Sequence, residues 1–99
     1  FLYLVSLLGV TGARKKITTF NLSFIKRVCD LTRNSSIPVA VGFGISEPAH
    51  VRAILKTGAA GVIVGSALVN IVANNLENVE SASRQLARFV RSLKDATSV

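Results

Sequence analysis

Residues 37–46 read IPVAVGFGIS, and this stretch decides the fold. Its apolar part, Val39 to Val41, is typical of a buried strand, and Pro38 stands at the position where a strand tolerates proline. The strand runs into Gly42 and Gly44, and glycine lets another group approach the backbone closely. Ser46 has the side chain of a helix N-cap, and an acid and a proline follow it. The stretch therefore predicts a strand, a glycine turn and a helix.

The same order of elements extends to both sides of this stretch. Residues 1–6 read FLYLVS, an apolar run typical of a strand that is buried on both faces. Residues 61–64 read GVIV and predict a third strand, followed by Gly65, Ser66 and a short helix over the run ALVNIVANN. Apolar side chains at helical spacing predict further helices over about 21–32, 46–57 and 79–96. Strands that alternate with helices predict an α/β fold with a parallel sheet of about three βα units.

The predicted helices also carry local expectations. Asn21 or Ser23 is expected to cap the first helix, and Gly58 to end the second in a left-handed conformation. His50, in the first turns of the second helix, is expected at the surface. The buried face of the last helix is expected to consist of four apolar side chains: Leu86, Phe89, Val90 and Leu93.

Length and composition bound the class of protein. The chain has 99 residues, enough for one small domain, and we expect residues 1–99 to form a single unit. Its hydrophobic fraction of 49% is high for this size, and the chain begins at Phe1 inside an apolar run. We therefore expect it to be part of a longer protein. Its one cysteine, Cys29, rules out a disulfide within the chain, predicts a buried structural thiol and fits a reducing, cytoplasmic location.

The formal net charge of +7 raises the question of a nucleic-acid or membrane partner. The basic residues are dispersed between the cluster at 14–16 and one face of the last predicted helix. No aromatic residues are interleaved with them to stack on bases, so we expect no nucleic-acid partner. The apolar run at the start is about half of the ~20 residues that a membrane-spanning helix needs, so we expect no membrane partner.

Candidate binding residues lie where strands end. In parallel sheets with helical crossovers, ligands bind at the carboxyl ends of the strands. Gly44 and Gly65 follow two consecutive strands, and Ser66 begins a short helix whose first amides favour an anion. A strand end of this kind can simply turn the chain, but two in succession favour phosphate. The sequence therefore predicts a phosphate site.

Groups that transfer protons are harder to place. None of the acidic residues lies near a predicted strand end, where a general base could reach a ligand: Asp30, Glu47, Glu77, Glu80 and Asp95. We find neither a metal-ligand cluster nor a nucleophile beside a base. We therefore expect a binding half-site without catalytic residues and without a metal.

The segments YLVSLLGVTG, PVAVGFGIS and GAAGVIVGSALV, in this order, closely resemble the C-terminal part of the tryptophan synthase alpha subunit. The resemblance implies strands six to eight of a TIM (β/α)8 barrel. It also implies a lyase that cleaves indole-3-glycerol phosphate to indole and glyceraldehyde 3-phosphate. The partner would be a beta subunit, and pyridoxal phosphate would be bound only there, so no cofactor is expected on this chain.

The resemblance also assigns residues. Gly44, Gly65 and Ser66, with Gly12 of a loop, would surround the substrate phosphate. Thr11 would support closure of that loop, and the indole pocket would be lined by three side chains: Tyr3, Phe43 and Ile63. The family often has an arginine where this chain has Leu7, so a loop-closing role for that arginine is not expected here. Because the catalytic carboxylates of the family lie on earlier strands, the isolated chain is expected to be inactive.

Two alternatives remain open from the residues. One is another phosphate-binding TIM barrel, of the phosphoribosyl isomerase, epimerase or thiamine-phosphate synthase type. The other is a half-barrel without enzymatic activity that binds an anion or a partner.

Overall fold

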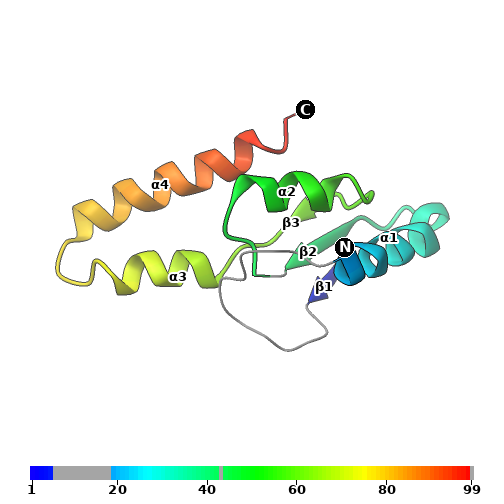
Figure 1. Ribbon diagram of the computed structural model, residues 1–99, viewed down its shortest axis with the longest axis horizontal. Helices are drawn as coiled ribbons and strands as arrows, with labels where there is room; N and C mark the ends of the chain where they lie inside the picture. The colour runs from blue at the N-terminus through cyan, green and yellow to red at the C-terminus, as the bar shows by residue number, and fades with distance from the viewer. Residues whose placement is uncertain (6–18, 43, 99) are drawn as a thin grey trace.

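The structure, a computed structural model, describes residues 1–5, 19–42 and 44–98. Within these ranges strands alternate with helices, as Figure 1 shows. The elements are β1 (Leu2–Val5), α1 (Thr19–Thr32), the 3-10 turn η1 (Arg33–Ser35), β2 (Val39–Gly42), α2 (Pro48–Leu55), β3 (Gly61–Val62), α3 (Ser66–Ala73) and α4 (Val79–Asp95).

The strands of the described part form one parallel sheet in the order β1-β2-β3. Leu2 pairs with Val39, and Ala40 pairs with Gly61. Parallel pairing brings the carboxyl ends of all three strands to one edge of the sheet. The predicted fold class, an α/β arrangement of parallel βα units, is therefore confirmed.

Helices cover one face of this sheet. Val39 and Val41 are 3% and 0% exposed and form a core with Ile25 of α1, Ile54 of α2 and Leu93 of α4. These β-branched and leucine side chains point from strand and helices toward one another, which is why the core lies between the sheet and the helix layer.

The opposite face of the sheet is more open. Because side chains alternate along a strand, Tyr3 and Val5 point away from the core, and they are 50% and 51% exposed. The prediction that the first strand is buried on both faces is therefore wrong for this chain. The physical reason is that β1 lies at the edge of the described sheet, on which the described helices pack from one side.

The helix ends agree in part with the sequence predictions. Gly58, after α2, has a φ of +108°, so its predicted left-handed conformation is confirmed. The prediction that Asn21 or Ser23 caps α1 is wrong, because the helix begins earlier, at Thr19. Asn21 instead lies in the first turn of α1 and is 5% exposed.

The buried stripe of α4 differs from the prediction at one position. Ala82, Leu93 and Ala96 are buried, and Phe89 packs against the core. Val90 is 48% exposed, so its predicted place on the buried face is wrong. Successive residues of a helix point about 100° apart. The buried side of α4 is centred on Ala82, Leu93 and the C-cap Ala96, and Val90 lies off this side, toward solvent.

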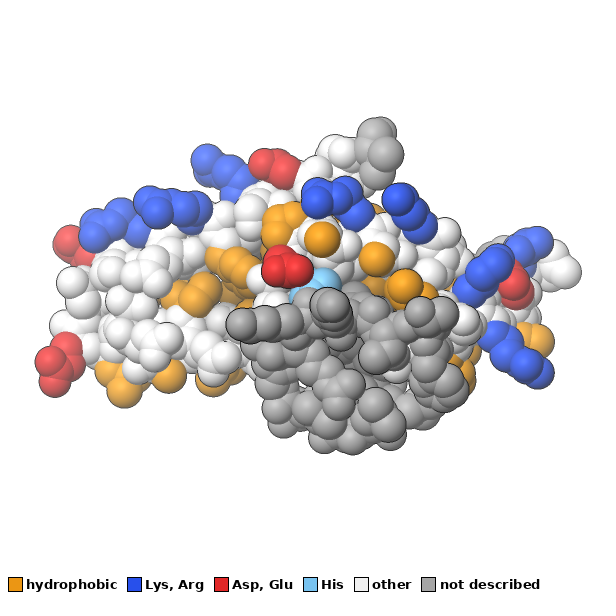
Figure 2. Space-filling model, in the orientation of Figure 1, with side chains coloured by type: hydrophobic (Ala, Val, Ile, Leu, Met, Phe, Trp, Pro, Cys, Tyr) orange, Lys and Arg blue, Asp and Glu red, His pale blue; other side chains and the backbone are white. Residues whose placement is uncertain are grey.

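Helices α3 and α4 form a hairpin that extends from the sheet, and the molecule measures 47 × 28 × 21 Å (Figure 1). Asn78 caps α4, since its side-chain oxygen accepts the N–H of Ser81 at 2.9 Å. The side-chain amides of Asn75, in the turn after α3, and Gln85 of α4 are joined by hydrogen bonds of 3.2 and 3.4 Å. Figure 2 shows basic side chains along α4 and hydrophobic side chains along the opposite margin, over α3.

Candidate functional site

The carboxyl ends of β2 and β3 lie side by side. The register pairs Ala40 with Gly61 and Val41 with Val62. The N–H of Ile63 continues the contact by donating to the carbonyl of Val41 at 2.8 Å. The two predicted glycines thus follow the carboxyl ends of neighbouring parallel strands.

The start of α3 supplies free amides at this edge. Gly65 is the N-cap, and its carbonyl accepts the N–H groups of Leu68 and Val69 at 2.9 and 3.0 Å. Helix geometry leaves the amides of Ser66 and Ala67 without an intrahelical acceptor, where the helix dipole favours an anion. Ser66 is the first helical residue of α3, as the sequence predicts, and Gly65 occupies the N-cap position.

The space beside Gly65 is open. A Cβ atom built on Gly65 would have no atom within 4 Å, and the φ of −128° suits residues other than glycine. The fold of the described residues therefore does not require glycine here. The open space leaves room for another molecule to approach this backbone closely.

The turn before α2 is organised differently. The residue that caps α2 is Glu47, so the prediction that Ser46 is its N-cap is wrong. The backbone N–H of Ser46 instead donates to Nδ1 of His50 at 3.1 Å, and Pro48 has no N–H. This helix start therefore offers an anion fewer amides than the start of α3.

His50 was expected at the surface, but it is 5% exposed. His50 is next to Val51, which is also buried. The buried face of α2 is therefore wider than the spacing of its apolar residues indicates. The sequence contained one signal for this burial: His50 comes four residues after Ser46, so its ring can reach the backbone of the turn.

The open face of the sheet carries the residues predicted for an indole pocket. Strand alternation places Tyr3 of β1 on the same face as Gly42 of β2 and Ile63, which is 36% exposed. A Cβ on Gly42 would lie 2.8 Å from Oη and 2.9 Å from Cε1 of Tyr3, so the ring of Tyr3 rests against the Gly42 backbone. Gly42 was not among the predicted site residues, although it belongs to the quoted GFG run.

Three further predicted site residues lie outside the described residues: Thr11, Gly12 and Phe43. Their assigned roles stay predictions.

No carboxylate lies on a strand of the described sheet, and the one that is nearest to a strand end in the sequence, Glu47, belongs to the turn between β2 and α2. All five acidic residues of the chain are on helices or in connections: Asp30 on α1, Glu47 at the start of α2, Glu77 before α4, and Glu80 and Asp95 on α4. The described residues also contain no group of three or more His, Cys, Asp or Glu that could hold a metal ion. The described strands therefore supply no carboxylate for proton transfer on the open sheet face.

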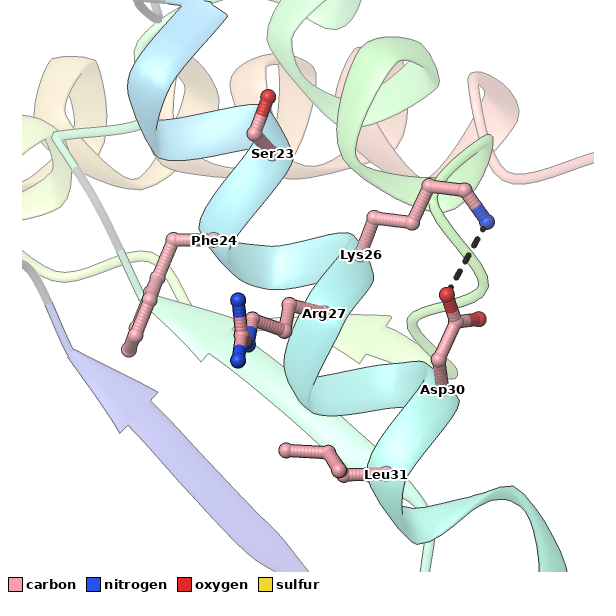
Figure 3. Close-up of a pocket in the computed structure, with 6 residues that line it drawn as sticks. All are labelled: Ser23, Phe24, Lys26, Arg27, Asp30 and Leu31. Carbon is pink, nitrogen blue, oxygen red and sulfur yellow. Dashed lines mark hydrogen bonds and ion pairs between the residues drawn. The ribbon is translucent and has the colours of Figure 1, made fainter.

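A hollow on the outer surface of α1 lies away from the strand ends (Figure 3). Phe24, Arg27 and Leu31 point to one side of the helix, and Lys26 and Asp30 lie on the other. Its walls all come from one helix, and no predicted site residue is among them. We therefore do not place the ligand there.

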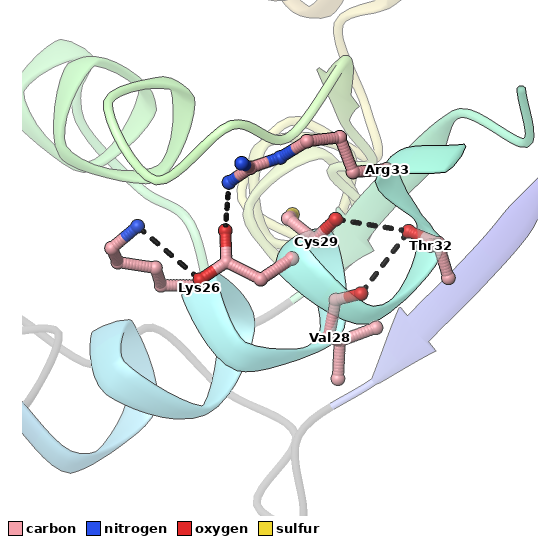
Figure 4. Close-up of polar contacts among 6 residues, drawn as sticks. Lys26, Val28, Cys29, Thr32 and Arg33 are labelled. Carbon is pink, nitrogen blue, oxygen red and sulfur yellow. Dashed lines mark hydrogen bonds and ion pairs between the residues drawn. The ribbon is translucent and has the colours of Figure 1, made fainter. Parts of the chain in front are cut away.

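Cys29 lies on the other flank of α1, close to the polar contacts of Figure 4. The side chain is partly buried and packs against the core. Burial raises the pKa of the Cys29 thiol, and the hydrogen bond with Thr57 acts in the opposite direction. A raised pKa keeps the group a thiol at neutral pH, which agrees with the predicted structural role.

Over the described part of the chain, no helix has both the length and the apolar character needed to cross a membrane.

Comparison with known proteins identifies the family. The model of the tryptophan synthase alpha chain family matches residues 1–98. The tryptophan synthase alpha chain of Methanoregula boonei is 48% identical over 96 residues, which cover 97% of this chain and 35% of the relative. That of Arabidopsis thaliana is 46% identical, over 97% of this chain and 34% of the relative.

Solved structures agree. The tryptophan synthase A-subunit of Pyrococcus furiosus superposes with a TM-score of 0.75 and 38% identity, covering 96% of this chain and 35% of that one. A tryptophan synthase α2β2 complex from the same organism contains a chain with a TM-score of 0.72 and 42% identity, over 94% of this chain and 35% of that one. The chain thus spans about a third of the length of these relatives, which are TIM barrels. It belongs to the tryptophan synthase alpha chain family.

Proposed function

We propose that this chain provides substrate-phosphate loops and part of an indole pocket to a lyase of tryptophan biosynthesis. The reaction is the cleavage of indole-3-glycerol phosphate to indole and glyceraldehyde 3-phosphate. The proposal depends chiefly on one observation: Gly44 and Gly65 follow neighbouring parallel strands at the same sheet edge, in a chain that belongs to this family.

The phosphate would be bound mainly at the start of α3. The amides of Ser66 and Ala67 are available there, and the open space beside Gly65 lets a phosphate oxygen come within hydrogen-bond distance. Gly44 would complete the site from the neighbouring strand, where its φ of +21° is accessible to glycine. Backbone N–H groups fixed by two strand ends bind a phosphate without a large reorganisation.

The indole ring would lie on the open face of the sheet. Tyr3 and Ile63 supply an aromatic and an aliphatic wall there, and Gly42 sets the position of the Tyr3 ring. A planar apolar ligand gains from burial against such side chains. We propose that Phe43 contributes to the same pocket, and that Gly12 and Thr11 act on the phosphate side.

Proton transfer would depend on groups outside this chain. None of its five carboxylates lies on the open sheet face, so the cleavage would need acids or bases from other strands of the barrel. By analogy with the Pyrococcus furiosus α2β2 complex, we propose a beta subunit as the protein partner. Pyridoxal phosphate would belong to that subunit, and we propose no cofactor for this chain.

Titration of the 15N-labelled chain with sn-glycerol 3-phosphate tests the proposal. The amide signals of Gly44, Gly65, Ser66 and Ala67 should shift together, with one affinity. Glycerol at equal concentration is the control and should shift none of them. Shifts confined to the basic face of α4 would instead indicate nonspecific anion binding and would contradict the proposal.

A further inference from the structure

We propose that His50 is a positioning residue that fixes the turn between β2 and α2, and with it Gly44. The role of His50 in the turn follows from contacts within the chain. Its effect on substrate binding rests on the proposed function.

The His50 ring connects the turn to the helix. Nδ1 of His50 accepts the backbone N–H of Ser46 at 3.1 Å. The backbone N–H of His50 donates to the carbonyl of Glu47 at 3.0 Å. His50 is therefore bonded to two successive residues of the turn, once through its ring and once through its backbone.

The second ring nitrogen faces a carboxylate. Nε2 of His50 lies 3.4 Å from Oε1 of Glu47, whose side chain is 53% exposed, while that of His50 is 6% exposed. A ring nitrogen that accepts a hydrogen bond carries no proton, so Nε2 is the ring nitrogen that can donate, toward Glu47. The Glu47 carboxylate thus lies beside one ring nitrogen, while the other accepts the Ser46 amide.

The other side of the turn is held by the core. The side chain of Ile45 is 3% exposed and belongs to the same cluster as Val41 and Val51. With Ile45 anchored in the core and the Ser46 amide bonded to His50, the peptide unit between them cannot rotate freely. Gly44 directly precedes this unit, so its backbone direction at the strand end is set by the same two restraints.

Three substitutions separate the contributions of the ring. Asparagine at position 50 places Oδ1 close to the former position of Nδ1, so His50→Asn retains the acceptor for Ser46. Glutamine places its amide nitrogen close to the former position of Nε2, so His50→Gln retains the donor to Glu47. His50→Leu fills volume but retains neither group. A merely structural role would not distinguish the first two variants.

The experiment measures hydrogen exchange of the Ser46 amide and sn-glycerol 3-phosphate affinity in the chain and its three variants. Slow Ser46 exchange should persist in His50→Asn and be lost in His50→Gln and His50→Leu. Affinity should stay within about twofold in His50→Asn and fall about five- to tenfold in the other two, the effect of one hydrogen bond. Equal values in His50→Asn and His50→Leu, or no change in any variant, would overturn the inference.

The two proposals can fail separately. If the unsubstituted chain does not bind sn-glycerol 3-phosphate, the proposed function fails, and Ser46 exchange still decides the role of His50 in the turn. Circular dichroism shows whether each variant folds. Where one does not, the same substitution is made after residues 1–98 replace the matching segment of the Pyrococcus furiosus subunit, and the KM and kcat of indole release are measured. The inference then expects a higher KM in His50→Gln with little change in kcat.

Discussion

At the scale of single residues, the glycines near the strand ends differ in what surrounds them. A Cβ on Gly42 would collide with the Tyr3 ring, whereas a Cβ on Gly65 or Gly61 would meet no atom within 4 Å. Glycine at position 42 is therefore explained by packing within the chain. Glycine at position 65 is not explained in this way, and substitutions can distinguish the two cases.

Replacing Gly65 by alanine should weaken phosphate binding without unfolding the chain. No clash is expected, and the free energy of unfolding should change by less than about 1 kcal/mol, the scale of an N-cap substitution. The added methyl group would stand between the ligand and the amides of α3, so sn-glycerol 3-phosphate affinity should fall at least about tenfold. Urea unfolding and the amide titration measure the two quantities.

Gly61→Ala is the matched control, because the methyl group is equally unhindered but lies at the start of β3, away from its carboxyl end. It should leave the affinity for sn-glycerol 3-phosphate unchanged. If the two variants bind equally well, backbone approach at Gly65 is not part of the site.

Replacing Gly42 by alanine should displace the Tyr3 ring. The new methyl group would lie 2.8 Å from Oη in the present arrangement, and Tyr3 is half exposed, so the ring can move at a cost of about 1 kcal/mol or less. Indole affinity should fall severalfold, because the ring forms a wall of the proposed pocket. The chain has no tryptophan, so the fluorescence of added indole reports binding directly.

A double-mutant cycle checks this coupling between Gly42 and Tyr3. In the Tyr3→Ala background, Gly42→Ala should have no further effect on indole affinity, since the ring it displaces is already absent. Additive losses in the double variant would show that Gly42 acts on binding by another route.

The sequence predicts these residues unevenly. Gly44 and Gly65 could be picked out because glycine after an apolar strand is a local signal, and both follow strands of the sheet. The contact of Tyr3 with Gly42 and the burial of His50 depend on strand register and on the width of a packed helix face. Neither is a property of neighbouring residues in the sequence, which is why both escaped the sequence-based predictions.

At the scale of elements, α1 shows how charges support a helix end (Figure 4). Asp30 lies 3.4 Å from Nζ of Lys26 and 2.6 Å from a guanidinium nitrogen of Arg33. Loss of hydration acts to raise the pKa of Asp30, but the two basic partners outweigh it and hold that pKa below its ordinary value. All three side chains are exposed, so the stabilisation is small.

The depressed pKa fixes the sign of a pH dependence. The stabilisation by Asp30 is present above the ordinary aspartate pKa of about 3.9 and is lost as the pH falls through the lower pKa of the folded chain. The difference in unfolding free energy between the chain and Asp30→Asn should therefore be constant from pH 7 to 5 and shrink below about pH 4. Urea unfolding across this range measures it.

The double variant Lys26→Gln/Arg33→Gln serves as the control for this prediction. In its background, Asp30→Asn should leave the pH dependence almost unchanged. A difference that stays constant down to pH 2 in the original chain would show that the ion pairs do not perturb Asp30.

Element types and their order were predictable from periodicity, whereas element ends were not. The helix over 79–96 and the strand at Val39 to Val41 appear as expected because each has a regular apolar pattern. The start of α2 was predicted one residue too early, because Glu47 rather than Ser46 occupies its N-cap position. On α4 and at its C-cap, two of the buried residues are alanines, and an alanine is a weaker sign of a buried position in a sequence than a valine such as Val90.

At the scale of the whole molecule, exposed apolar side chains lie on and beside β1, on α1 and on the hairpin of α3 and α4. Phe1, Tyr3 and Val5 are at least half exposed on or next to β1, and Leu31 on α1 is 77% exposed. On the hairpin, Val69 and Leu76 are 66% and 74% exposed. We propose that, in a full barrel of the length of its relatives, neighbouring units would cover the β1 edge, since these surfaces are large for a small domain.

The distribution of charge on the whole chain leads to the last prediction. The open sheet face has apolar side chains and glycines, and every carboxylate is on the helices or in connections. Acid–base cleavage of indole-3-glycerol phosphate needs a group within hydrogen-bond distance of the transferred proton. The chain alone should therefore bind the phosphate but release no indole above background in a coupled fluorescence assay.

The chimera in which residues 1–98 replace the matching segment of the Pyrococcus furiosus subunit should release indole, because it restores the remaining strands of the barrel around the same binding half-site. Gly65→Ala in this chimera should raise KM about tenfold or more, whereas Gly61→Ala should not. Turnover by the isolated chain would mean that one of its own residues transfers the proton. An inactive but folded chimera would contradict the proposal that the strand ends of this chain position the substrate, because the chimera supplies the other strands of the barrel around them.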